Sequence, residues 1–104
     1  MQKGEIWWAE LPKPAGRRPV LILSRDKAAQ VREFVTIAEI TRTVRDIPVE
    51  VSLGIQDGLP KSCVVNLDVI NTIPKQILVK FISILNPIKM RHVETALKFA
   101  LDIS

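Results

Sequence analysis

Two adjacent arginines are the clearest chemical feature of the sequence. Arg17 and Arg18 stand directly before Pro19 and a short apolar run, so they lie at the start of a predicted buried strand. A guanidinium stays charged and forms planar, bidentate hydrogen bonds with phosphate oxygens. Proline fixes the backbone beside them, and strand alternation sends the two side chains to opposite sides. The pair predicts a phosphate-binding site, and the two arginines are not expected to be equivalent in it.

Other kinds of catalytic site find little support. His92 is the single histidine, within the predicted C-terminal helix, which excludes a Ser-His-Asp triad. Cys63 lies in an apolar stretch and is expected to be a small core residue. One histidine and one cysteine do not make a structural zinc set, and the four scattered glycines form no phosphate-cradling motif. We therefore expect neither a metal nor a cofactor.

The remaining polar residues suit chemistry at a phosphate. RNA can be cleaved by attack of its own 2′-hydroxyl, which requires no protein nucleophile and no metal. Such a reaction requires in-line positioning, stabilisation of charge at phosphorus, and proton transfer. An arginine beside a threonine hydroxyl can position the phosphate and stabilise the charge that develops on it.

Basic residues are concentrated in the first half of the chain. Residues 13–45 contain eight basic and three acidic side chains, and the net charge of the whole chain is +4. This distribution fits a surface that faces a polyanion. It fits an ordinary solvated basic face equally well, so charge alone does not separate the two interpretations.

The chain is predicted to form five or six short strands rich in β-forming residues. A helical turn is expected at 25–30, and residues 71–76 are expected to form a tight turn or a brief helix between the last two strands. The run 19–24 is apolar on both faces, which is typical of a central or covered strand. The predicted strands are 5–11, 19–24, 33–41, 48–53, 61–70 and 78–85.

An amphipathic helix is predicted at the C-terminal end. Asn86 is a suitable N-cap, Pro87 fits the first helical position, and Leu85 can pack on Met90. The apolar positions that follow share one helical face. Short strands followed by one such helix indicate a mainly β fold, a small β-barrel with a packed C-terminal helix, in a single domain over 1–104. The apolar stripe is Met90, Val93, Leu97, Ala100 and Leu101.

The expected compartment is the cytoplasm. A lone cysteine cannot form an internal disulfide, which suits a reducing environment. No apolar run approaches the roughly 20 residues of a membrane span, and the N-terminal residues lack the long apolar stretch of a secretory signal.

An ordered set of motifs resembles the MazF/PemK family of toxin ribonucleases. "KGEIWWAELP", "GRRPVLILS", "EIT" and "DGLPKSCVVNLDVINTI" follow one another as in that family, before a helix that ends in "ALKFAL". Each motif alone has low specificity, but the ordered set spans nearly the whole chain.

The resemblance implies an SH3-like barrel, a homodimer, and metal-independent, sequence-selective cleavage of single-stranded RNA. It also implies a cognate antitoxin whose disordered acidic tail covers the active site. The family's catalytic arginine and threonine correspond to Arg18 and Thr41. A strand acid used by some members corresponds to Asp68, and Asn66, two residues earlier, is expected on the same face.

One departure concerns the first loop. The family usually has a longer loop there than residues 12–16, so an acid or histidine from that loop has no counterpart. Glu39 is a substitute proton acceptor by hypothesis, since it is expected to share a strand face with Thr41. The alternative is a carboxylate that faces solvent or a partner.

Further RNA contacts are predicted with structural alternatives beside them. Arg17 and Arg42 would bind flanking phosphates or remain solvated. Trp8 would stack on a base or belong to a dimer contact, with Trp7 then in the core. Ser24 would bond near the site or only close its strand.

Two rival functions share the expected fold. One is a non-catalytic barrel toxin of the gyrase-poison type, which acts by binding a protein. The other is an RNA-binding barrel that has lost activity with its shortened loop. Neither the cleavage motif nor the antitoxin can be deduced from the sequence.

Overall fold

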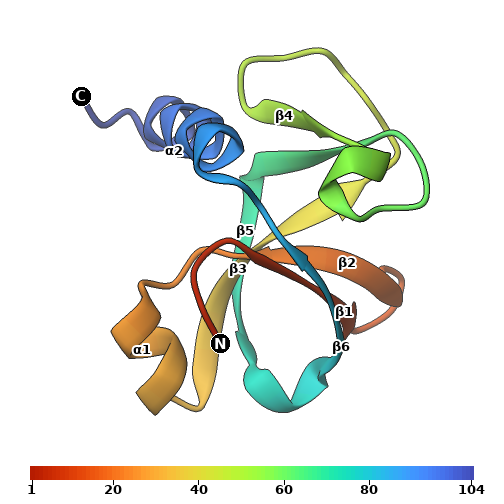
Figure 1. Cartoon of the computed structure of the whole chain (residues 1–104), viewed down its shortest axis with the longest axis vertical. Helices are drawn as coiled ribbons and strands as arrows, with labels where there is room; N and C mark the ends of the chain where they lie inside the picture. Colours follow the sequence, from red (N-terminus) through yellow and green to blue (C-terminus); the bar gives the residue numbers. More distant parts are fainter.

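The protein is a curled antiparallel sheet of six strands with two helices, seen in a computed structural model that describes residues 1–104 (Figure 1). The strand order is β4-β5-β3-β2-β1-β6, so β4 and β6 are the two edges of an open half-barrel. The strands are β1 (Glu5–Glu10), β2 (Arg17–Ile22), β3 (Phe34–Thr41), β4 (Glu50–Leu53), β5 (Cys63–Pro74) and β6 (Leu78–Ile84). The helices are α1 (Asp26–Val31) and α2 (Pro87–Leu101), with 3-10 turns η1 (Ile55–Asp57) and η2 (Lys75–Ile77).

The sheet buries apolar side chains on both faces. Along β2, Leu21 belongs to one core, while Val20 and Ile22 belong to the other. This alternation explains the continuous apolar run of the strand, because a central strand covered on both faces needs no polar side. The first core also contains Val93 of α2, which packs over β4 and β5, and Figure 1 shows α1 at the opposite end of the molecule.

The C-terminal helix begins as its sequence predicts. The Asn86 Oδ1 accepts the Lys89 N–H at 2.8 Å, and Pro87 occupies the first turn. Val93 is fully buried, and Met90, Leu97 and Ala100 pack against the same core. The prediction was wrong for Leu101, which is 49% exposed because it lies in the last turn, beyond the sheet-covered part of the helix.

Two strand boundaries differ from the predictions in ways that matter. The predicted break at 71–76 was wrong in part: β5 continues to Pro74, and only residues 75–77 form a 3-10 turn. Pairing with β3 from Phe34↔Pro74 onward outweighs the local turn propensity. The second strand starts at Arg17, two residues earlier than predicted, and both arginines are paired with β1.

The mainly β fold with a C-terminal helix is confirmed. No helix has both the length and the apolar character needed to cross a membrane.

Candidate active site

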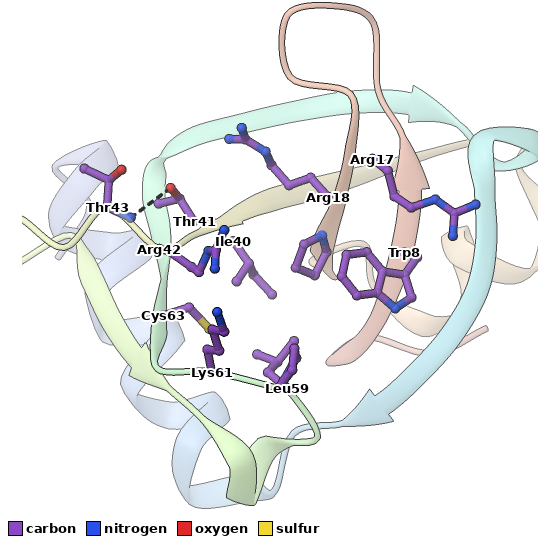
Figure 2. A pocket seen from close by; sticks show the side chains of 12 residues that line it. Trp8, Arg17, Arg18, Ile40, Thr41, Arg42, Thr43, Leu59, Lys61 and Cys63 are labelled. Atoms are coloured by element: carbon purple, nitrogen blue, oxygen red, sulfur yellow. Dashed lines mark hydrogen bonds between the residues drawn. The ribbon is translucent and has the colours of Figure 1, made fainter.

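A cleft of about 570 Å³ opens beside the paired arginines (Figure 2). Its walls come from the start of β2, the end of β3 and the segment that joins η1 to β5. The volume falls within the roughly 300–1,000 Å³ typical of small-ligand sites. The lining residues are Trp8, Arg17, Arg18, Pro19, Ile40, Thr41, Arg42, Thr43, Leu59, Pro60, Lys61 and Cys63.

The charge of the cleft is entirely positive. Four of its twelve lining residues are cations, and none is an acid. Arg17 Nε pairs with Glu10 Oε1 at 2.7 Å, and Arg18 Nη1 pairs with Glu39 Oε1 at 3.3 Å. The other two cations, Arg42 and Lys61, form no ion pair. A charged ligand in this cleft would have to be an anion.

The two adjacent arginines are not equivalent. Figure 2 shows the Arg18 side chain pointing toward Thr41, whereas that of Arg17 points the other way, past Trp8. The Arg18 side chain is 34% exposed, against 56% for Arg17. The predicted divergence of the two side chains is therefore seen, although both line the cleft. Because Arg18 is more enclosed, its charge is less screened by water and acts more strongly on a bound anion.

Thr41 ends β3 at the wall of the cleft. Its Oγ1 accepts the backbone N–H of Thr43 at 3.2 Å. A hydroxyl that accepts one hydrogen bond keeps its own hydrogen free to donate. The turn therefore fixes the Thr41 oxygen and leaves its proton available to a ligand oxygen.

The loop after Thr41 is held by a carboxylate from the next strand. Glu50 Oε1 accepts the Arg45 N–H at 3.0 Å and the Asp46 N–H at 2.9 Å, and Oε2 lies 3.2 Å from the Arg45 nitrogen. Asp46 has a φ of 57°, a left-handed conformation that is unfavourable for most residues. Glu50 thus fixes a strained loop whose first residues, Arg42 and Thr43, line the cleft.

Another wall is built by the turn after β4 and the segment that follows it. Asp57 is buried, and its Oδ2 accepts the Gly54 N–H at 3.0 Å. Gly58 has a φ of 88°, and a Cβ there would lie 2.8 Å from Ser83, so only glycine fits. Leu59 and Cys63 are buried on either side of Lys61. Lys61 was not among the predicted site residues, although it lies within the motif DGLPKSCVVNLDVINTI that carries the family resemblance.

Cys63 lines the cleft and is largely buried. Burial raises the pKa of its thiol, and the nearby Asp57 carboxylate raises it further. The thiolate is the nucleophilic form. At neutral pH this residue is therefore a packing residue, as its apolar surroundings predicted.

Five of the predicted site residues come together in the cleft: Trp8, Arg17, Arg18, Thr41 and Arg42. Glu39 does not line the cleft, but its carboxylate accepts a hydrogen bond from Arg18, which does. Trp7 packs against the second core, and its ring meets Phe81 edge-to-face at a centroid distance of 5.8 Å. Trp8 therefore lines the cleft, whereas Trp7 packs against the core, and both are partly buried.

Three predicted site residues lie outside the cleft. Ser24 follows the far end of β2, about 20 Å of extended chain from Arg18, and its Oγ accepts the Thr36 N–H at 2.8 Å. Asn66 is buried, and its Oδ1 accepts the N–H of the exposed Asp68 at 2.9 Å. The predicted shared face for Asn66 and Asp68 was wrong, because a pairing irregularity opposite Ala38–Ile40 interrupts the alternation of β5.

No group of three or more His, Cys, Asp or Glu side chains is arranged to hold a metal ion.

Comparison with known proteins identifies the family. Residues 2–101 match the family described as PemK-like, MazF-like toxin of type II toxin-antitoxin system, and the chain belongs to that family. It is 39% identical over 103 residues to the probable endoribonuclease MazF5 of Mycobacterium tuberculosis (strain ATCC 25618 / H37Rv), a match that covers 98% of this chain and 94% of the relative.

Solved structures agree with the family assignment. The Mycobacterium tuberculosis toxin MazF-mt6 superposes with a TM-score of 0.89 at 34% identity, covering 96% of this chain and 98% of that one. An endoribonuclease in complex with its cognate antitoxin from Mycobacterial species gives a TM-score of 0.88 at 29% identity, covering 100% and 97%. The predicted resemblance is confirmed, and the gyrase-poison alternative is not favoured.

Proposed function

We propose that this chain is the endoribonuclease toxin of a type II toxin–antitoxin system and that it cleaves single-stranded RNA in the basic cleft. The observation that carries the proposal is the convergence of the Arg18 guanidinium and the Thr41 hydroxyl in a cleft without acidic lining residues. The names of its relatives, which include endoribonucleases, support the same activity.

The reaction is attack of a ribose 2′-oxygen on the adjacent phosphorus. The bond from phosphorus to the 2′-oxygen forms while the bond to the 5′-oxygen breaks. The 2′-hydroxyl loses its proton to water, and the departing 5′-oxygen takes a proton from water, so no net proton is gained or lost. Arg18 donates hydrogen bonds to the phosphorane oxygens, whose negative charge grows in the transition state, and Thr41 donates to the same group. The products are a 2′,3′-cyclic phosphate and a 5′-hydroxyl, and no step requires a metal.

Glu39 acts through Arg18 rather than on the RNA. Its carboxylate holds the Arg18 Nη1 at 3.3 Å and does not line the cleft. It is therefore a positioning residue, which limits the orientations of the guanidinium before substrate binds. Such preorganisation lowers the reorganisation required during the reaction.

Single-stranded RNA fits the remaining lining residues. Unpaired bases can stack on an aromatic side chain, which Trp8 presents at the cleft wall. Arg17 and Arg42 also line the cleft, and we propose that they contact phosphates that flank the scissile one. Because these contacts release counterions, RNA binding should weaken as salt concentration rises.

The proposed protein partners follow from charge and exposed apolar surface. An antitoxin with an acidic, disordered tail would complement the cationic cleft and block it, and relatives have been solved with their cognate antitoxins. We propose a homodimer as well, since Val79, Phe81 and Ile84 leave the edge strand β6 with exposed apolar side chains. The expected site of action is the cytoplasm, where messenger RNA is available.

The test is cleavage of a long unstructured RNA by the parent and by Arg18→Ala. Loss of one charge-stabilising donor should slow cleavage about 100- to 1,000-fold. Arg18→Lys should recover only part of the rate, because an ammonium lacks the planar fork. Binding without cleavage by the parent would instead support an inactive RNA-binding barrel. Absence of both would support a toxin that acts by binding a protein.

A further inference from the structure

Lys61 is the cleft cation that the proposed chemistry leaves without a role. It lies in the segment between η1 and β5, just before the residues of β5 that pair with the end of β3 at Thr41. Figure 2 shows it beside Cys63 and Leu59, on the side of the cleft where Arg42 lies. It forms no ion pair with any carboxylate of the chain.

The position of Lys61 is fixed by its neighbours. Leu59 and Cys63, two residues before and after it, are both buried. The Leu59 N–H donates to the Gly54 carbonyl at 3.2 Å, within a turn that Asp57 also closes. The backbone of this exposed lysine is therefore anchored on both sides. Its side chain extends from a fixed point at the rim of the cleft.

The charged side chains of the cleft can only donate hydrogen bonds. Arg17, Arg18, Arg42 and Lys61 have no acceptor, and no carboxylate or amide side chain lines the cleft. Uracil and guanine carry a keto oxygen, O4 or O6, where cytosine and adenine carry an amino group. The Lys61 amino group can therefore donate to the keto oxygen of uracil or guanine, whereas the amino group of cytosine or adenine at the same position would face another donor.

An apolar surface for the ring of the base lies in the same cleft. Trp8, Pro19 and Pro60 line it and are all accessible to solvent. The face of a base can lie on such a surface while its edge meets a donor. Lys61 directly follows Pro60, so the amino donor and part of the apolar surface belong to one anchored segment.

We propose that Lys61 is a specificity-determining residue that donates to the keto oxygen of a guanine or uracil next to the scissile phosphate. This inference rests on the proposed endoribonuclease function, and it adds a base preference and the residue that causes it. A lysine that contacted only phosphate would strengthen the binding of all sequences equally, whereas a lysine that reads a base edge discriminates among them.

The experiment compares cleavage and binding of RNAs that differ at one position. Short single-stranded RNAs that differ only in the base at one central position are given to the parent, to Lys61→Met and to Lys27→Met; where the parent cleaves, that position is the one beside the cleaved phosphate. Lys27 is exposed on α1 outside the cleft, which makes its variant a matched control for the loss of one positive charge. Equilibrium binding of the same RNAs is measured by fluorescence anisotropy over a range of salt concentrations.

The parent and Lys27→Met should prefer the keto bases about tenfold or more. Lys61→Met should lose that preference, mainly through weaker binding of the guanine and uracil RNAs. An equal loss for all four bases, with a shallower salt dependence, would identify a phosphate contact and overturn the proposal. So would an unchanged preference in Lys61→Met. A further outcome separates the two proposals. If the parent binds keto bases preferentially and Lys61→Met loses that preference, but the parent cleaves no RNA, the proposed enzyme activity is overturned and the recognition role of Lys61 stands.

Discussion

Replacing Glu39 by glutamine separates an orienting carboxylate from a catalytic proton acceptor. The 3.3 Å contact joins Glu39 Oε1 to Arg18 Nη1, between side chains that are 20% and 34% exposed. Ion pairs with this degree of solvent access contribute at most about 1 kcal/mol. An amide oxygen can still accept from Arg18, so the variant loses the charge but keeps an acceptor. We therefore expect cleavage to slow by no more than about fivefold.

A general base would behave differently. Removing one typically costs about 100- to 10,000-fold, and the pH dependence that belongs to its ionisation disappears. The assay is initial-rate cleavage of a fluorogenic single-stranded RNA, measured across the pH range in which circular dichroism shows the protein to be folded. Our account predicts a pH profile of unchanged shape for Glu39→Gln.

Glu10→Gln is the matched control. Glu10 holds Arg17 at 2.7 Å on the more exposed side of the same pair of arginines, and its loss should change the rate less than the loss of Glu39. A fall of more than about 100-fold in Glu39→Gln, together with a lost limb of the pH profile, would refute the positioning role. It would make Glu39 the proton acceptor instead.

Three further predictions follow from the walls of the cleft. Thr41→Val should slow cleavage about 10- to 100-fold, because a hydrogen bond to a charged group is lost. Thr41→Ser keeps the hydroxyl and should stay near the parent rate. Equal cleavage rates for the valine and serine variants would show that the hydroxyl has no part in the reaction. Glu50→Ala should lower the free energy of unfolding in urea by about 1–3 kcal/mol and speed hydrogen exchange at Arg45 and Asp46, whose N–H groups it binds. Unchanged exchange would show that Glu50 does not hold the loop. The raised pKa of Cys63 keeps its side chain in the thiol form. Iodoacetamide should therefore alkylate the folded protein more slowly than the urea-unfolded protein at mildly alkaline pH. Equal alkylation rates would contradict this prediction.

Short sequence patterns predicted the elements that depend on interactions between residues close together in the chain. The Asn86-Pro87 cap and the buried positions of α2 follow from side-chain chemistry within two helical turns, and the structure confirms them up to Ala100. The apolar run of β2 predicted a central strand for the same reason. The prediction that Arg18 and Thr41 belong to one site had another origin. It came from the family resemblance and not from the spacing of the two residues in the sequence.

What the sequence could not show depends on pairing between distant segments. The continuation of β5 to Pro74 is imposed by β3, and the irregularity that separates Asn66 from Asp68 arises in the same pairing. Lys61 follows the turn at Gly58, which lies against Ser83 of β6, a residue far away in the sequence. Ser24 is a different case, because the direction of β2 already places it at the end of the strand away from Arg18.

The chemistry of the RNA ends tests the central claim most directly. Purified protein is incubated with an unstructured RNA in EDTA, and both ends of each product are identified by mass spectrometry and by 5′-phosphorylation with a kinase. Our account predicts cleavage in EDTA with 2′,3′-cyclic phosphate and free 5′-hydroxyl ends, lost in Arg18→Ala. Products with 5′-phosphate ends, or activity abolished by EDTA, would contradict it.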